Sequence, residues 1–346
     1  MKTSVHNLTL NLSWELIKRI SQIDRFDASW SSIEKREGQT LKQLKSIATV
    51  RSVGASTRIE GSQLSDEQVE ALLLDVDITT LVDRDSQEVV GYFNTHDMIS
   101  ESWKEIDITE NSLKFLHQTL LRFSRKDDWH RGDYKQQSNA VEARMPDGTS
   151  QTISETTLPG FPTQDAMGAL IDWYAKDQQT HPLVKCALFC YEFVTIHPFQ
   201  DGNGRLSRLL ATLLLLKHKY AWIEYVSFEH EIESRKAEYY RVLRSCQAGR
   251  PNEDVTEWVA FFFDALVNIQ QSLTEKLNIT GIIATLSPRD KAIITFIENH
   301  PGSRSGLIAE QLNIPSPTVK KALAELVAKK LLKKHGSGPG TNYSVA

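Results

Sequence analysis

Cysteine is scarce in this chain: three residues in 346 are too few for a disulfide framework, which excludes the small disulfide-stabilised domains. Long apolar runs are also missing. The longest, Leu209–Leu216, is far shorter than the roughly 20 residues that a membrane helix needs. Residues 1–17 lack the continuous apolar segment of a signal peptide, so we expect a cytoplasmic protein with no membrane contact. The net charge of −4 gives no general attraction to nucleic acid.

The composition is that of a soluble globular protein, with 40% hydrophobic and 24% charged residues. At 346 residues the chain is longer than one average domain, and we expect two or three units. Two of the cysteines, Cys186 and Cys190, lie four residues apart in an apolar segment with helical periodicity. We expect them to be core residues, because a free thiol behaves as a small hydrophobe and no further metal ligands are evident nearby.

One short segment concentrates the chemistry of the chain. Residues 197–205 are His-Pro-Phe-Gln-Asp-Gly-Asn-Gly-Arg, and Arg208 follows. A Gly-Asn-Gly turn before an apolar helix directs free N–H groups and a helix N-terminus at an anion. Asp201 is a hard oxygen ligand for Mg²⁺, Arg205 and Arg208 can bind phosphate oxygens, and His197 can accept a proton near neutral pH. The alternative, a glycine-rich loop before a core helix, is disfavoured, because these fixed positions should occur by chance on the order of 10⁻⁸ times.

The segment is similar to the signature of the Fic family, His-x-Phe-x-(Asp/Glu)-Gly-Asn-Gly-Arg-x-x-Arg, and matches it at every fixed position. The resemblance implies that a histidine deprotonates a Ser, Thr or Tyr hydroxyl on a target protein, which then attacks the α-phosphate of ATP and receives AMP. Such chemistry depends mainly on positioning and charge stabilisation. The implied roles are His197 as base, Phe199 as inward-packing anchor, Asp201 as Mg²⁺ ligand, and Gly202, Asn203, Gly204, Arg205 and Arg208 as the groups around the phosphates.

The Doc branch of the family transfers phosphate instead of AMP. It usually has lysine where this chain has Gly202. The difference favours AMP transfer, and a Doc-type phosphotransferase stays as an alternative.

A second motif lies upstream, where residues 56–61 are Ser-Thr-Arg-Ile-Glu-Gly and match the inhibitory pattern of the family, (Ser/Thr)-x-x-x-Glu-(Gly/Asn). On a helix, Ser56 and Glu60 lie one turn apart on the same face, and Gly61 follows the helix end. The resemblance implies that Glu60 pairs with Arg208 and takes the place of the γ-phosphate, so that ATP binds unproductively. In some relatives the same glutamate also supports removal of AMP, which the sequence permits.

The resemblance also indicates adenine contacts. Tyr239 and Tyr240 lie where relatives have aromatic residues near the base, and Gln247 stands where relatives often have Asn. For the two tyrosines the alternative is an ordinary amphipathic helix. Lys135 departs from the family, which usually has Arg there, and this change loses bidentate hydrogen bonding.

Most other segments have a helical period. The predicted helices are Leu12–Ile23, Ser29–Arg36, Leu41–Arg58, Ser65–Leu74, Val89–Ile99, Asn111–Leu121, Thr163–Lys176, Leu183–Val194, Leu206–Lys219 and Glu253–Leu273. Ser65 and Gln68 form a capping-box pattern. Alternation at residues 141–144, a Pro-Asp-Gly turn and a segment rich in Thr and Ile at 151–157 predict a short β-hairpin. In Fic proteins a hairpin at this place, the flap, holds the target by main-chain pairing; the alternative is a plain surface hairpin.

The last sixty residues predict a separate module. Helices at Pro288–Asn299, Ser305–Leu312 and Ser316–Lys330 precede a β-wing at residues 333–343, which resembles a winged-helix domain. From residue 286 onward nine Lys and Arg face four Asp and Glu, so the module carries +5 and the remainder −9. Its third helix, with Lys320 and Lys321, could enter a DNA major groove. The alternative is a module that packs on the catalytic body or mediates a homodimer.

Together these features predict a mainly α protein in three parts: an N-terminal helical region with the inhibitory helix (residues 1–90), a Fic helical core with a β-hairpin flap (91–278), and a winged-helix domain (286–346). The expected function is ATP- and Mg²⁺-dependent AMP transfer to a target protein, or to the chain itself, under inhibition by Glu60. One alternative is a DNA-binding regulator that uses the Fic body as a nucleotide sensor. The other is the Doc-type phosphotransferase.

Overall fold

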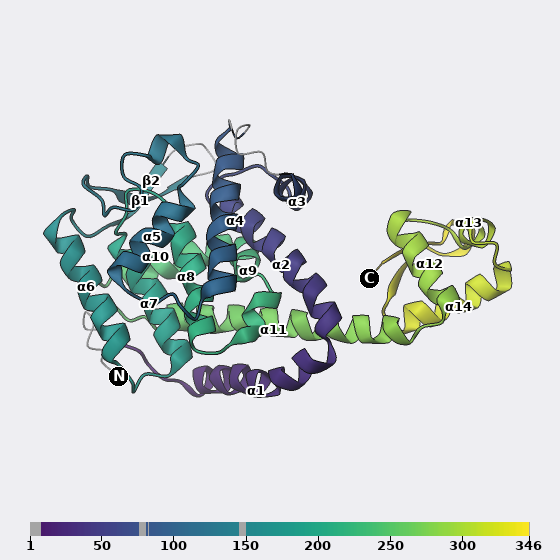
Figure 1. The fold of residues 1–346 in the computed structure, drawn as a ribbon. Coiled ribbons are helices and arrows are strands. Elements are labelled where there is room, and N and C mark those ends of the chain that lie inside the picture. The colour runs from purple at the N-terminus through teal and green to yellow at the C-terminus, as the bar shows by residue number, and fades with distance from the viewer. Residues whose placement is uncertain (1–7, 76–80, 82, 145–149, 346) are drawn as a thin grey trace. The chain divides into compact units, whose positions relative to one another are not determined.

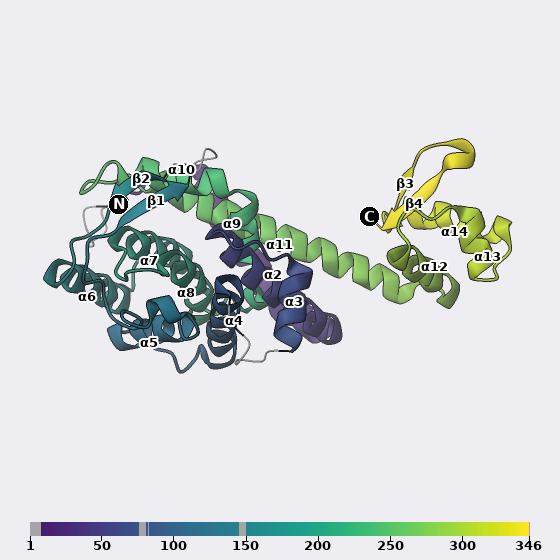
Figure 2. The ribbon, with the colours of Figure 1, turned by 90° about the horizontal axis from the view of Figure 1, so that it is seen from above.

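In the computed structural model, the structure describes residues 8–75, 81, 83–144 and 150–345. Within these ranges the chain forms fourteen α-helices and two antiparallel two-stranded sheets (Figures 1 and 2). It divides into two compact units, residues 1–273 and 274–346. The chain is mainly α, as predicted. No helix in these ranges combines the length and the apolar character needed to cross a membrane.

The first unit begins with four helices, α1 (Trp14–Arg36), α2 (Gly38–Ile59), α3 (Asp66–Leu74) and α4 (Arg84–Ser102). The prediction of two helices in the region of α1 is wrong. One helix runs through, because the residues between Ile23 and Ser29 include neither Gly nor Pro to interrupt it. The capping box before α3 is confirmed: Ser65 accepts from the N–H of Gln68, and the Gln68 side chain accepts from the N–H of Ser65.

The rest of this unit is built around α7. Its helices are α5 (Glu110–Leu120), α6 (Phe161–Lys176), α7 (Pro182–Ile196), α8 (Asn203–Lys217), α9 (Phe228–Ser234), α10 (Lys236–Gln247) and the part of α11 (Thr256–Thr285) up to Leu273, with short 3₁₀ turns η2 (Arg125–Asp127) and η3 (Ala221–Tyr225). Every residue of α7 from Leu183 onward is buried, as expected for a helix that packs on all sides, including against α6 and α8. Cys186 and Cys190 lie in this core, as predicted.

The predicted hairpin is present. Strands β1 (Ala140–Arg144) and β2 (Ser150–Glu155) pair antiparallel, from Ala140 opposite Glu155 to Arg144 opposite Ser150. The hairpin lies beside α10 (Figure 2). The predicted Pro-Asp-Gly turn falls in residues 145–149, outside the described residues.

The second unit holds α12 (Pro288–Asn299), α13 (Ser305–Gln311) and α14 (Ser316–Ala328), followed by β3 (Leu332–His335), the 3₁₀ turn η4 (Gly338–Gly340) and β4 (Asn342–Val345). The strands pair antiparallel, and Tyr343 of β4 also bridges to Ser303. An apolar core joins the three helices to the start of β3, with Ile297, Ile308 and Leu323 fully buried. Three helices and a hairpin thus stand where they were predicted, while the winged-helix assignment stays a prediction.

Candidate active site

The loop His197–Gly202 joins two buried helices. α7 ends at Ile196 and is followed by His197, which has a left-handed φ of 54°, and α8 begins after Gly202, which has a φ of 80°. Glycine adopts this region freely, whereas a histidine is strained there unless its surroundings fix it. The side-chain amide of Asn203 closes the loop: its oxygen accepts from the N–H of Phe199 (2.9 Å), and its nitrogen donates to the carbonyl of Phe199 (2.8 Å). Phe199 itself is fully buried.

Lys135 ties the loop to the segment that leads into the hairpin. Its main-chain N–H donates to the carbonyl of Pro198 (2.8 Å). Its buried ammonium donates to Asn139 Oδ1 (3.0 Å), Thr156 Oγ1 (2.8 Å) and the carbonyl of Ile196 (3.2 Å). Burial lowers the pKa of Lys135 to about 8. The lysine therefore fills the position of the family arginine with three separate hydrogen bonds, without the bidentate fork.

His197 is held in one tautomer. Its Nδ1 lies 3.2 Å from the carbonyl oxygen of Val194, so Nδ1 must carry the proton that donates to it. Nε2 is then the nitrogen that can accept a proton. Burial lowers the pKa of His197 to about 4, against an opposing effect of the Val194 hydrogen bond. The imidazole is neutral at pH 7, in the form that a general base requires.

Asp201 carries the one carboxylate of the loop. Its Oδ1 accepts from the N–H of Gly202 (2.6 Å) and from Arg205 Nη2 (3.3 Å), and its Oδ2 pairs with Lys126 Nζ (3.1 Å). Burial alone would raise the pKa of Asp201, but Arg205 and Lys126 outweigh it and hold this pKa well below its usual range. Asp201 is therefore ionised and partly exposed, and it has cations as its present partners.

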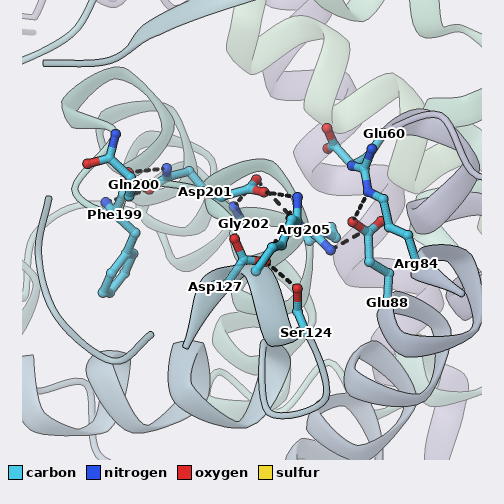
Figure 3. A network of polar contacts seen from close by, with 12 residues as sticks. Glu60, Arg84, Glu88, Ser124, Asp127, Phe199, Gln200, Asp201, Gly202 and Arg205 are labelled. Atoms are coloured by element: carbon cyan, nitrogen blue, oxygen red, sulfur yellow. Dashed lines mark hydrogen bonds and ion pairs between the residues drawn. The ribbon is translucent and has the colours of Figure 1, made fainter. Parts of the chain in front are cut away.

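Arg205 differs from the prediction in where it points. Its side chain is 1% exposed and lies between Asp201 and Glu88 of α4, with Nη1 3.4 Å from Glu88 Oε2 (Figure 3). Glu88 is buried as well and also pairs with Arg84 at 2.7 Å. The guanidinium predicted to contact phosphate is thus enclosed in a chain of ion pairs behind the loop.

Arg208 is paired with Glu60, the contact that the family resemblance implies. Its Nη2 donates to Glu60 Oε1 (2.7 Å) and to the main-chain oxygen of Ser56 (3.1 Å), and its Nε donates to Ser56 Oγ (2.8 Å). Arg208 is 2% exposed and Glu60 29% exposed. Burial would raise the pKa of Glu60, but Arg208 and Arg205 lower it overall. The carboxylate is therefore charged and occupies one edge of the guanidinium.

The end of α2 is fixed firmly in this place. Arg58 forms a bidentate pair with Glu233, at 2.6 Å from Nε and 3.0 Å from Nη2. Lys236 Nζ donates to the carbonyl of Ile59 (2.7 Å). Gly61 follows with a φ of 109°, a conformation that suits glycine and ends the helix. The end of α2 is thus held against α9 and α10.

These groups surround a cavity of about 250 Å³. Nine of the predicted site residues line it: Glu60, His197, Asp201, Gly202, Asn203, Gly204, Arg208, Tyr239 and Tyr240. The two tyrosine rings meet edge to face at 5.2 Å. Three predicted site residues lie outside this lining. Arg205 is paired behind the loop, Ser56 is buried behind Arg208, and Gln247 is buried with its amide donating to Thr195 (2.9 Å).

The sequence analysis did not assign several residues that shape the site. Asn139, Val194, Gln200 and Leu243 line the cavity, and Lys126 and Glu88 pair with the motif residues. Gln200 stands at a variable position of the motif and Val194 lies three residues before His197, so the motif placed both near the loop without indicating a role. Glu88, Lys126, Asn139 and Leu243 come from four other segments, and only the fold brings them to the site.

The fold and the site define a class of protein: a helical domain in which one helix–loop–helix gathers a neutral imidazole, a carboxylate, a helix N-terminus and an arginine around a small cavity. Residues 107–215 match the model of the Fic/DOC family, and the chain carries a domain of this family.

Sequence relatives agree with this match. A protein adenylyltransferase Fic from Drosophila willistoni is 26% identical over 253 residues, which cover 71% of this chain and 46% of the relative. The Drosophila virilis protein of the same name is 24% identical over 318 residues, covering 86% of this chain and 60% of the relative. The chain spans about half the length of the curated relatives it matches.

Solved structures share the fold. A Fic family protein from Desulfovibrio desulfuricans aligns with a TM-score of 0.64 at 24% identity and covers 97% of both chains. A Fic domain-containing signalling protein from Bacteroides thetaiotaomicron aligns with a TM-score of 0.57 at 22% identity, over 74% of this chain and 97% of the other. At these identities the likeness concerns the fold alone.

Proposed function

We propose that this chain is a protein adenylyltransferase, which transfers AMP from ATP to a Ser, Thr or Tyr hydroxyl of a target protein or of the chain itself. The observation that carries the proposal is the shared cavity: His197, Asp201, the helix N-terminus at Gly204 and Arg208 all line it. The family match and the names of the curated relatives support the same reaction.

In this reaction the target hydroxyl oxygen forms a bond to the α-phosphorus of ATP. The bond from that phosphorus to the oxygen bridging the α- and β-phosphates breaks, and pyrophosphate leaves. The hydroxyl proton passes to Nε2 of His197, the nitrogen that the Val194 hydrogen bond leaves available. The first N–H groups of α8 have no partner within the helix, so they can donate to phosphate oxygens. A base of this kind contributes about 10²–10⁴ in rate.

The donor set of the cavity suits Mg²⁺ when a nucleotide supplies further oxygen ligands. Asp201 offers one ionised carboxylate, and within the described part of the chain no group of three or more His, Cys, Asp or Glu is placed to hold a metal by itself. Mg²⁺ commonly takes one or two carboxylates and completes its shell with water and phosphate oxygens. When bound, it would neutralise charge on the α- and β-phosphates. Asp201 would hold the ion, and its ion pair with Lys126 would then weaken or break.

We also propose that the structure corresponds to an inhibited state. Arg208 is the cation that would meet the γ-phosphate, and Glu60 already occupies one edge of it. ATP can then bind only with its phosphates displaced, so its α-phosphate is turned away from attack. Removal of AMP from a modified target, supported by the same glutamate, is compatible with this placement.

The test uses ATP labelled at the α- or the γ-phosphate, with wild type and Glu60→Gly. Incorporation of the α-label into protein, with an added AMP mass in the intact chain, is the expected result. Incorporation of the γ-label alone would instead establish the Doc-type phosphotransferase.

A second function is suggested by the basic surface of the second unit. Lys320 and Lys321 of α14 are exposed, while Val319, Ala322 and Leu323 of the same helix are buried. Lys333 and Lys334 of β3 are exposed as well. A helix that packs by one face and presents lysines on another can bind DNA phosphates. We propose DNA contact by this unit as the runner-up, with the Fic body as its nucleotide sensor.

A further inference from the structure

His117 on α5 has no part in the function proposed above, yet it touches the catalytic loop. Its side chain is fully buried, and it lies 84 residues before Asp201 in the sequence. Its Nε2 is 2.9 Å from the carbonyl oxygen of Asp201. The main-chain carbonyl of the proposed metal ligand is thus held by a side chain from another helix.

The hydrogen bonds define one tautomer of His117. The N–H of Gly132 donates to Nδ1 at 2.9 Å, so Nδ1 carries no proton. Nε2 must then carry the proton and donate it to the Asp201 carbonyl. A protonated ring could not accept from Gly132. Burial keeps the ring neutral, with a pKa of about 3.

The ring of His117 supports the loop at two further points. It stacks on Phe199 with centroids 3.8 Å apart and an angle of 8° between the planes. It also lies against Gly202, where an added Cβ would be 3.4 Å from Nε2 and 3.5 Å from Cδ2. The same imidazole therefore contacts Phe199, Asp201 and Gly202. These residues form the turn that places the Asp201 carboxylate at the cavity.

From these contacts we propose that His117 is a positioning residue for Asp201, which fixes the turn in the geometry that binds a metal together with a nucleotide. The proposal rests on the proposed function, because the metal and nucleotide are those of AMP transfer. Partners of this kind, one step removed from the metal, typically change metal affinity or activity by about 10–100-fold when they are replaced.

A purely structural role is the rival explanation, and His130 provides the matched control. It is also a buried histidine, 4% exposed, and its ring centroid is 6.3 Å from that of His117. Its Nε2 bonds to Asp127 at 3.0 Å. Replacement of His130 therefore disturbs the same region through a different contact.

The experiment uses the full chain with Glu60→Gly as the parent, and measures Mn²⁺ affinity in the presence of an ATP analogue with a methylene group between the α- and β-phosphorus. His117→Leu should weaken Mn²⁺ binding about 10–100-fold and lower kcat. His117→Gln keeps a donor long enough to reach the Asp201 carbonyl, whereas the shorter Asn reaches only Gly132. His117→Gln should therefore bind Mn²⁺ more tightly than His117→Asn. His130→Gln should leave Mn²⁺ affinity unchanged.

Two results would overturn the proposal. One is a folded His117→Leu chain with the Mn²⁺ affinity and kcat of its parent. The other, decisive where the leucine variant does not fold, is equal Mn²⁺ affinity for the Gln and Asn variants. AMP incorporation by the parent tests the proposed function separately. A parent that transfers no AMP refutes that function, while the order of Mn²⁺ affinities among the variants still decides the role of His117.

Discussion

Glu60→Gly is the change that tests the proposed inhibited state most directly. It removes the 2.7 Å bond from Arg208 Nη2 but leaves the two bonds from Arg208 to Ser56, at 2.8 and 3.1 Å. The guanidinium therefore keeps its position while one edge becomes free for phosphate. Because Glu60 is 29% exposed and Arg208 keeps two hydrogen bonds to Ser56, the loss of stability should stay below the figure for breaking a fully buried ion pair, about 3–5 kcal/mol.

The magnitude of activation follows from this contact. A hydrogen bond to a charged group contributes about 1.5–3 kcal/mol. ATP must offset that amount before its γ-phosphate can replace Glu60 on Arg208. At about 1.4 kcal/mol for each factor of ten, the release corresponds to a rise in AMP transfer of roughly 10–150-fold.

Intact mass after incubation with ATP and Mg²⁺ measures the effect on the chain itself. Glu60→Gly should gain AMP much faster than wild type, and adding His197→Ala should abolish the gain. Glu70→Gly is the matched control, because this glutamate is exposed on α3. Equal AMP incorporation by wild type and Glu60→Gly would refute the inhibitory role of Glu60.

Three further outcomes are expected. Asp201→Ala should lose Mg²⁺-dependent transfer in the Glu60→Gly chain while keeping its circular dichroism spectrum, and undiminished α-labelling would refute the ligand role. Because burial lowers the pKa of His197 from 6.5 to about 4, its base form persists to lower pH, so the acid limb of kcat/KM should lie nearer pH 4 than pH 6.5; a limb at 6.5 or above would contradict the lowering of this pKa by burial. In gel shifts with random duplex DNA, replacing Lys320 and Lys321 by Glu should weaken binding by the full chain and reduce its dependence on salt, and binding that ignores both salt and the substitutions would remove DNA as a partner.

The sequence predicts the site well where the chemistry lies in one continuous run. His197, Asp201 and Arg208 share a loop and the first turns of one helix, so their spacing alone brings them together. The contact between Glu60 and Arg208 joins residues 148 apart. Local periodicity places Glu60 at a helix end, but only the family pattern indicates which cation it meets.

The remaining features depend on tertiary packing, which leaves no local signal. Arg205 has the same residue type and nearly the same position as Arg208, yet the buried Glu88 of α4 turns it away from the cavity. The helix α9 was not predicted, since its seven residues are too few to establish a period. His117 looks in sequence like an ordinary residue of an amphipathic helix, and only the fold places it against the loop.

The exposed fractions of the ion pairs in the site indicate which of these pairs ATP and its metal can open. Lys126 pairs with Asp201, and Arg208 pairs with Glu60; each of these two pairs has a member at least 29% exposed. The pair of Arg205 with Glu88 is 1% and 2% exposed. Exchanging a partner costs less in a pair with one solvated member, because water solvates the displaced group, whereas opening the buried pair would leave an uncompensated charge. Productive binding of ATP and its metal should therefore displace Lys126 and Glu60 from their partners and leave Arg205 in place. In the inhibited state that we propose, ATP also binds unproductively while Glu60 keeps Arg208. Because both modes bind one ATP, a saturating ATP concentration should not relieve the inhibition, and a large gain in AMP transfer by wild type at saturating ATP would contradict this account.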